Sequence, residues 1–266
     1  MGNMENSVKP HENKMGTMPM TRLILTMSLP AIFSMTIQAM YNVVDSIFIG
    51  NYDADGLTAT SLAYPLQMLL IAFAAGTAVG VNSFVSRKLG EKNFVQANDG
   101  ATHGFVTCIF NYVIFLLLGL FAVRPFMAMY TQNEAIVNYG IQYLTVVLCF
   151  SFFSIVQIMV ETGNMIFPML SQLFGAIVNI IFDPLLIFGI GIFPEMGVLG
   201  AAIATVFGQF CGMVFCLCIL FFKNNEVKVS FKHFKLNGST LKSIYVVGFP
   251  SVIMQSGCRY CSRYIL

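Results

Sequence analysis

Two acidic residues lie deep inside long apolar segments of this sequence. Asp45 stands 15 residues after Pro30, and Asp183 stands 17 residues after Ile166, in segments that both cross in the same direction. At 1.5 Å per residue these separations are roughly 22 and 25 Å, so both carboxylates are predicted at a similar depth in the outer half of a membrane. An ionisable group at the centre of a bilayer costs roughly 2.5–3.5 kcal/mol on insertion scales, so it usually has a partner or a function.

Other polar residues accompany the first acid at helical spacing. Gln38, Asn42 and Asp45 are separated by four and three residues, which stacks them along one face of a helix. We expect Gln38 and Asn42 to support the carboxylate as a polar stripe. Pro30 precedes them on the same segment, and a proline inside a helix removes one backbone hydrogen bond. We therefore predict that Pro30 is a hinge, while a packing kink remains the alternative.

The second acid has polar neighbours of its own. Asn179 precedes Asp183 by one helical turn, and Thr205 lies at a comparable depth in the next apolar segment. Oxygen ligands from three helices can bind Na⁺ or hold exchangeable protons, and two carboxylates in one dry site cannot both stay ionised at low cost. The sequence therefore predicts a cation-coupling site at Asp45, Asn179, Asp183 and Thr205, with Na⁺ ligands at the first three.

Two other roles for the acids stay open. In a purely structural role, Asp45 lies near the outer interface, where a charge is cheap, and Asp183 caps a helix that Pro184 breaks. An intramembrane aspartyl protease would carry its acids in Tyr-Asp and Gly-x-Gly-Asp contexts, whereas here they stand in Val-Asp-Ser and Phe-Asp-Pro. Neither H-E-x-x-H nor G-x-S-x-G occurs, so the sequence does not favour an enzyme.

The composition of the chain is that of a membrane protein. Its 266 residues are 57% hydrophobic and 10% charged, against roughly 25% charged residues in a soluble domain. The apolar runs are long and continuous, which favours spanning helices over a barrel of alternating strands. The predicted fold class is an all-α membrane protein, a six-helix transmembrane lobe plus the start of a seventh helix, with segments at about Arg22–Ile49, Leu57–Val85, Gly104–Val123, Ile136–Val160, Ile166–Ile192, Val198–Phe222 and from Ser243 onward.

Charge divides the connecting segments into two kinds. The basic kind carries Lys9, Lys14, Arg22, Arg87, Lys88, Lys92, Lys223, Lys228, Lys232, Lys235 and Lys242. The other kind carries Asp53, Asp55, Glu134 and Glu195 beside Arg124. The positive-inside rule therefore predicts a multi-pass protein of the plasma (inner) membrane with a cytoplasmic N-terminus, and no cleavable signal peptide is recognised.

The same charges suggest a division of the chain. We expect a cytoplasmic polar tail at residues 1–20, the six-helix lobe at 21–222, a basic cytoplasmic linker at 223–242 and a truncated first helix of a second lobe at 243–266. The first and seventh segments open alike, since Ser28–Ile32 and Gly248–Val252 both place a proline inside an apolar run after a basic loop. Tandem six-helix halves would produce this pattern, and so would chance.

No resident cofactor is predicted. Cys258 and Cys261 form a C-x-x-C motif, but the motif lacks a second pair, a nearby histidine and a soluble context. We expect ordinary thiols that face lipid or the protein core. The predicted ion is the coupling ion, H⁺ or Na⁺, and the other partners are membrane lipid and the transported substrate, with no nucleic acid.

Several segments resemble the multidrug and toxic compound extrusion (MATE) family. The similar stretches are Leu29–Ile32, Tyr41–Gly50, Ser86–Gly90, Asn179–Gly189, Gly200–Thr205 and Gly208–Gln209. The resemblance runs from about Thr21 to Phe222, and the stretch in the fifth segment is its most specific part. It implies twelve helices in two six-helix lobes, which export organic cations, including drugs, in exchange for H⁺ or Na⁺ by alternating access.

The resemblance also implies roles for single residues. In the prokaryotic branch that this chain resembles, the coupling site lies in the first lobe, and its members here would be Asp45, Asn179, Asp183 and Thr205. The first helix of that branch is thought to bend at its proline, here Pro30, on protonation.

The resemblance implies a second lobe as well. Members of the family are longer than this chain, and Arg259 and Arg263 depart from the apolar character of the family's seventh helix. The expected partner is therefore a second six-helix lobe, in cis in a full-length protein.

Three further interpretations of the whole chain remain. A lipid-linked saccharide flippase shares the architecture, and basic residues in the cavity would favour it because its substrates carry phosphates. The ionisable residues inside the first six spans are acidic, which favours organic cations instead. A seven-helix receptor would have the opposite orientation. A truncated remnant without transport activity is the third alternative.

Overall fold

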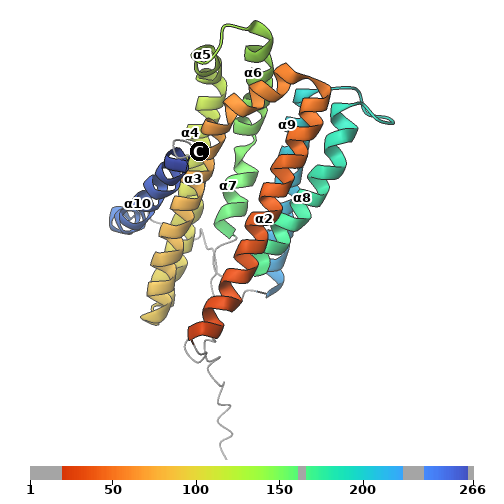
Figure 1. Cartoon of the computed structure of the whole chain (residues 1–266). Coiled ribbons are helices and arrows are strands. Elements are labelled where there is room, and N and C mark those ends of the chain that lie inside the picture. Colours follow the sequence, from red (N-terminus) through yellow and green to blue (C-terminus); the bar gives the residue numbers. More distant parts are fainter. Residues whose placement is uncertain (1–19, 161–165, 224–236, 263–266) are drawn as a thin grey trace, which may run out of the picture.

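The chain folds into a bundle of long helices (Figure 1). The computed structural model describes residues 20–160, 166–223 and 237–262, and no strand occurs among them. The helices are α2 Met20–Tyr52, α3 Ala54–Gly90, α4 Phe94–Phe121, α5 Val123–Ala128, α6 Glu134–Cys149, α7 Ser151–Val160, α8 Ile166–Ile187, α9 Val198–Lys223 and α10 Gly238–Ser262. The predicted all-α fold class is confirmed.

Some sequence predictions fall outside the described residues. These are the polar tail at 1–19, most of the basic linker at 224–236 and the end of the seventh segment at 263–266, which includes Arg263. The side chains of Cys258, Arg259 and Cys261 lie outside the description as well.

The described part of the chain has five helices that are long and apolar enough to cross a membrane, and six spans if a bent pair of helices counts as one. The helices α2, α3, α4, α8 and α9 are each long and apolar enough to cross a membrane, and α6 with α7 forms a sixth span that is bent by 47°. The predicted fourth segment, Ile136–Val160, therefore corresponds to two helices with a bend between them. The helix breaks at Phe150, and the bend lets α6 and α7 each pack against α9.

Two other predicted boundaries are corrected. The third helix begins at Phe94 rather than near Gly104, because Asn93 caps it by accepting a hydrogen bond from the N–H of Gln96 at 3.1 Å. The fifth ends at Ile187 rather than Ile192. Gly189 follows with a φ of 67°, a left-handed conformation that glycine adopts readily and that terminates helices.

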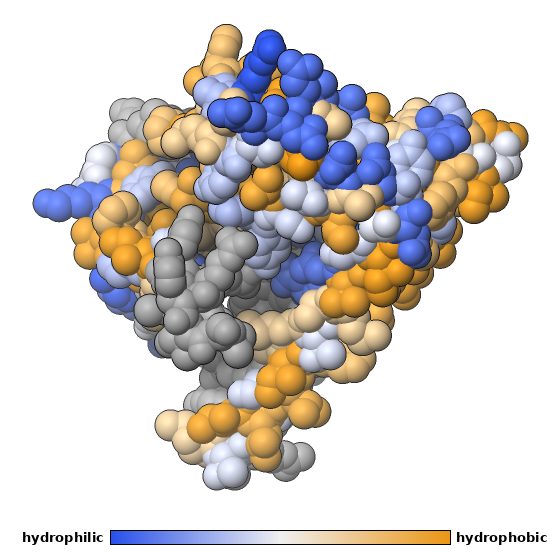
Figure 2. Space-filling view, turned by 45° about the horizontal axis from the view of Figure 1, so that its top comes forward, coloured by the Kyte–Doolittle hydropathy of each residue, from blue (hydrophilic) through white to orange (hydrophobic). Residues whose placement is uncertain are grey.

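The described ends of the bundle differ in charge as the sequence predicted. Asp53, Glu134 and Glu195 lie at the end that carries the α2–α3 and α5–α6 turns. Figure 2 shows hydrophilic side chains gathered at this end and hydrophobic ones on the flank below. Arg87 and Lys88 lie at the opposite end, where α3 finishes. Apolar side chains also remain exposed along α2 and α10, which suits a lipid or protein surrounding rather than water.

The helix α10 packs closely against α3 through glycines. A Cβ atom at Gly80 would lie 2.4 Å from the carbonyl oxygen of Ile244, and one at Gly248 would lie 2.8 Å from that of Gly76. Only residues without side chains allow two helix backbones to approach this closely, as at other small-residue helix crossings in membranes. The seam therefore fixes where α10 begins relative to α3.

Substitution at this seam tests the close approach. We expect Gly80→Val to destabilise the protein by about 1–3 kcal/mol, because the added side chain collides with backbone. Gly90→Val is the matched control, since nothing lies within 4 Å of a Cβ at that position near the end of the same helix. Unfolding in detergent measures both, and an equal loss in the two variants would contradict the seam.

Candidate functional site

The two buried carboxylates meet where α2 packs along α8. Ser34 on α2 donates a hydrogen bond to Gln172 Oε1 on α8, which sets the register of the two helices. Asp45 follows Ser34 by 11 positions, and Asp183 follows Gln172 by the same number, which is about three helical turns. The two aspartates therefore lie opposite each other three turns further along the same interface. Their carboxyl groups lie close enough to interact electrostatically. Asp45 is 8% exposed and Asp183 is 0% exposed.

Asn179 connects this pair to α9. Its Nδ2 lies 3.3 Å from Asp183 Oδ1 and 3.5 Å from Thr205 Oγ1, and it donates to both. The helices approach through Gly175 and Gly208, where a Cβ on Gly208 would lie 2.8 Å from the carbonyl oxygen of Gly175. The absence of side chains at this crossing brings Asn179 to Thr205. The structure therefore places Asp45, Asn179, Asp183 and Thr205 in one cluster.

The cluster is rich in acceptors and poor in donors. Asp45 Oδ1, Asn179 Oδ1 and Asp183 Oδ2 are buried and have no hydrogen-bond partner among the described residues. Buried acceptors of this kind each carry a desolvation penalty unless something donates to them. A proton shared between the carboxyl groups or a cation bound among the oxygens would satisfy them.

No basic side chain balances the pair in the described part of the chain. The buried residues there with an ionic side chain are Asp45, Asp183 and His103, and no lysine or arginine is buried. His103 lies on α4 and contacts the start of α10 through Asn237. The negative charge of the carboxylates is therefore not compensated by an internal salt bridge.

Tyr41 is a neighbour that the sequence reasoning did not select. It precedes Asp45 by one turn, as Asn179 precedes Asp183, so the two pairs face each other in the same register. Its hydroxyl interacts with Thr205 and lies close to both carboxyl groups. The matched spacing on the two helices was the signal available in the sequence, but it has meaning only when the helices are known to be neighbours.

Two further polar residues border the cluster. Tyr143 on α6 is 4% exposed, interacts with Gln67 on α3 and lies near both aspartates. Gln209 follows Thr205 by one turn on α9, and its Oε1 is buried without a hydrogen-bond partner among the described residues. The site thus draws side chains from five helices.

The remaining predicted residues lie on α2 and form no direct hydrogen bond with the two aspartates within the described residues. Gln38 and Asn42 are partly buried, and neither side chain forms a hydrogen bond within the described residues. Pro30 lies inside α2, one turn before Ser34. Their predicted roles as a supporting stripe and a hinge stay predictions.

The sequence match to known proteins decides the family. A family model described as MatE matches residues 30–185, which is more than half of the chain and includes both aspartates. The chain belongs to the MATE family. The resemblance predicted from the sequence is therefore confirmed, and the protein is a multi-pass membrane protein of a multidrug transporter family.

Named relatives support the same family. The chain is 29% identical to an FAD transporter of Shewanella oneidensis over 71% of this chain and 43% of the relative. It is 25% identical to the multidrug export protein MepA of Staphylococcus haemolyticus, over 88% of this chain and 52% of the relative. The chain thus spans about half the length of the curated relatives it matches.

Solved structures show the same MATE architecture. An outward-facing multidrug resistance MATE transporter of the MOP superfamily aligns with a TM-score of 0.78 and 29% identity, over 87% of this chain and 52% of that chain. A MOP superfamily transporter from Pyrococcus furiosus, described as having a binding pocket of reverse polarity, aligns with a TM-score of 0.79 and 28% identity, over 87% and 52%. About half of each solved chain is matched, so the described helices form one part of the MATE fold.

Neutralising one aspartate tests the repulsion in the pair. We expect Asp183→Asn to stabilise the chain by about 1–2 kcal/mol in a sodium-free detergent buffer at neutral pH. The amide replaces one of two buried carboxyl groups that cannot both stay ionised at low cost, and it keeps an acceptor for Asn179. Asp99→Asn on α4 is the control, since that carboxylate is exposed. Thermal unfolding measures both variants. Destabilisation by Asp183→Asn would show that the carboxylate contributes favourable bonds that an amide cannot replace.

Proposed function

We propose that this chain forms the ion-coupling part of a MATE antiporter, which exports organic cations and drugs in exchange for H⁺ or Na⁺. The observation that carries the proposal is the contact between two buried carboxyl groups, Asp45 and Asp183, from different helices and without a basic partner in the described residues. Such a pair changes its interaction energy whenever a cation arrives or leaves. Ion binding therefore has a direct effect on how α2 packs against α8.

The proposed mechanism uses the residues of the cluster in two alternative ways. With H⁺, a proton bridges Asp45 and Asp183 and removes the repulsion between them. With Na⁺, the cation lies among the two carboxylates and the Oδ1 of Asn179, while Thr205 completes the oxygen cluster. In either case α2 is drawn towards α8, and loss of the ion lets α2 move, with Pro30 as its hinge.

Organic cations are the substrate class that the charges favour. A positively charged substrate is attracted by carboxylates that have released their coupling ion, so ion and substrate exclude each other, as exchange requires. The relatives named as multidrug exporters agree with this choice. FAD, which the Shewanella relative is named for, carries phosphates, and a phosphate needs cationic ligands that the buried described residues do not supply.

A complete transporter requires a second lobe in this proposal. The relatives extend over about twice the matched length, and α2 and α10 expose apolar side chains on which another lobe can pack. We assign residues 21–222 to the six-helix lobe, and α10 starts the second lobe at Gly238 rather than near the predicted position 243. The basic residues Arg87, Lys88 and Lys242 support a cytoplasmic N-terminus in a plasma (inner) membrane.

Transport in a full-length protein containing this lobe tests the site. We expect Asp45→Asn and Asp183→Asn each to reduce ion-driven efflux of a fluorescent organic cation at least about tenfold. In either variant only one carboxyl group of the pair remains to bind and release the coupling ion. Everted vesicles with an imposed pH or Na⁺ gradient give the measurement and identify the coupling ion. Protein level in the membrane is measured in parallel.

Two controls make the result specific. Asp99→Asn removes an exposed acid of the same lobe and is expected to leave efflux unchanged. FAD uptake or release in the same vesicles tests the alternative substrate. Efflux that persists in both aspartate variants would refute the coupling site, and flavin transport without organic cation transport would refute the substrate class.

A further inference from the structure

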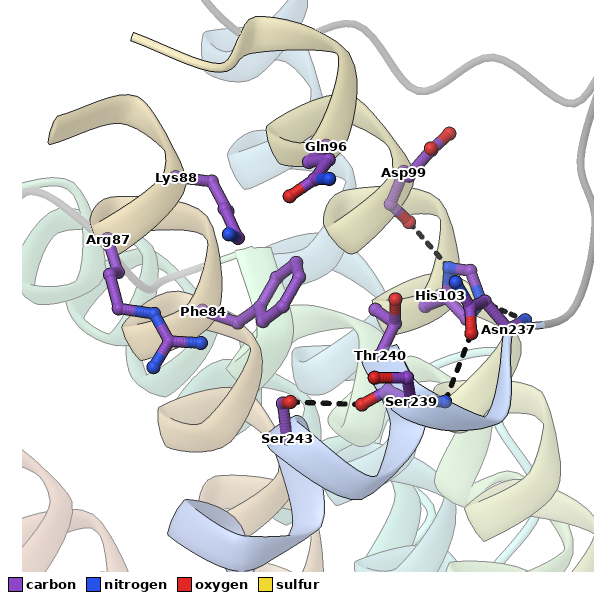
Figure 3. A pocket seen from close by; sticks show the side chains of 10 residues that line it. All are labelled: Phe84, Arg87, Lys88, Gln96, Asp99, His103, Asn237, Ser239, Thr240 and Ser243. Atoms are coloured by element: carbon purple, nitrogen blue, oxygen red, sulfur yellow. Dashed lines mark hydrogen bonds between the residues drawn. The ribbon is translucent and has the colours of Figure 1, made fainter. Parts of the chain in front are cut away.

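A second polar region lies far from the carboxyl pair, where α3 ends and α10 begins. A cavity of about 420 Å³ opens there between α3, α4 and α10 (Figure 3). Pockets of a few hundred Å³ are large enough for a small ligand or headgroup. None of the residues of the carboxyl cluster lines it. It is therefore a separate site.

Two cationic side chains form one wall of the cavity. The guanidinium of Arg87 and the ammonium of Lys88 lie 5.8 and 5.9 Å from the centre of the Phe84 ring, which also lines the cavity. Lys88 forms an ion pair with Glu91 at 2.8 Å. Arg87 has no carboxylate partner within the described residues. The exposed guanidinium of Arg87 thus lies beside the Phe84 ring and forms no ion pair within the described residues.

Neutral polar groups form the facing wall. Gln96 on α4 and Thr240 on α10 point into the same space as Lys88 in Figure 3. The carboxylate of Asp99 also lines the cavity, but it points away from Lys88 and Arg87 in that view. Lys88, Gln96 and Thr240 thus surround the cavity, and the exposed guanidinium of Arg87 lies at its edge beside Phe84. The lining includes two cations, an amide and a hydroxyl, a donor-rich set that suits an anion.

The start of α10 is held in place over this cavity. The N–H of Asn237 donates to His103 Nε2 at 3.0 Å, so the ring proton lies on Nδ1, which donates to the carbonyl oxygen of Asp99 at 2.7 Å. Asn237 Oδ1 in turn accepts from the N–H of Ser239 at 3.0 Å. The bond between Asn237 and His103 joins the start of α10 to α4, and the glycine seam joins α10 to α3. The cavity is therefore built from three helices whose relative positions are constrained.

We propose that this cavity binds a phosphate group, either of an anionic lipid headgroup or of free inorganic phosphate. Arg87 contacts the phosphate oxygens through its planar guanidinium, Lys88 adds a point charge, and Gln96 and Thr240 donate hydrogen bonds. Basic pockets between transmembrane helices are suited to headgroups because the acyl chains can remain in the surrounding bilayer. The site goes beyond the proposed antiport, since it contains none of the coupling residues.

The ion pair between Lys88 and Glu91 provides a specific test of phosphate binding. Glu91 lies outside the cavity lining and competes with the phosphate for Lys88. The hydrogen bond from Lys88 lowers the pKa of Glu91, so this carboxylate stays ionised at neutral pH and the competition persists. Removing the charge of Glu91 should therefore strengthen phosphate binding, whereas removing the charge of Arg87 should weaken it.

Binding of two probes to the purified full chain tests the proposal. Native mass spectrometry measures dioleoylphosphatidylglycerol against dioleoylphosphatidylcholine, and a thermal-shift titration measures inorganic phosphate. We expect Arg87→Gln to weaken phosphatidylglycerol binding about fivefold, the effect of one charge near a membrane surface. Glu91→Gln is expected to tighten it by a similar factor. Lys242→Gln, which removes an exposed lysine of α10 outside the lining, is the matched control and should change nothing.

A filled cavity provides the second arm. Thr240→Phe keeps every charge and occupies the space, so it should abolish binding while Lys242→Gln preserves it. Stabilisation by inorganic phosphate alone, sensitive to Arg87→Gln, would assign the site to free phosphate, and phosphatidylglycerol binding alone would assign it to lipid. Equal effects of Arg87→Gln and Lys242→Gln, or full binding by Thr240→Phe, would overturn the proposal.

Discussion

The contact between Asp45 and Asp183 is the constraint on which the rest of this structure depends. Two carboxyl groups that are buried in an apolar bundle and close enough to interact are unfavourable together unless a proton or a cation lies between them. The buried oxygen of Asn179 beside them has no hydrogen-bond partner among the described residues, so it also requires a donor or a cation. In the proposed antiport, the lobe has one stable packing with its ion and is strained without it, so ion exchange and helix movement would be one process.

Close helix crossings give this contact its precision. The bond from Ser34 to Gln172 sets the register of α2 on α8, and the approach of Gly175 to Gly208 brings α9 within reach of Asn179. In a membrane the hydrophobic effect does not hold helices together, so such packing and side-chain bonds have to do so. The two tyrosines and two glutamines around the pair come from α2, α3, α6 and α9.

The two ends of the lobe differ in the sign of their charged side chains. Acids predominate in the described turns at one end, and Arg87, Lys88 and Lys242 lie at the other. The same asymmetry that orients a membrane protein also places cations where lipid phosphates are found. The glycine seam between α3 and α10 holds the two helices together, and Arg87 and Lys88 line a cavity beside it.

The amino-acid sequence by itself determined the membrane class, the six spans, the sign of the buried charges and the similar depth of Asp45 and Asp183, because these depend on local composition and on the helical rise. It also carried the family resemblance. The break at Phe150, the end of α8 at Ile187 and the place of Tyr41 beside Thr205 were not predicted. Which helices become neighbours, and in which register, depends on contacts between residues far apart in the chain. Only the tertiary structure decided those, because a glycine crossing or a single interhelical hydrogen bond leaves no periodic signal in the sequence.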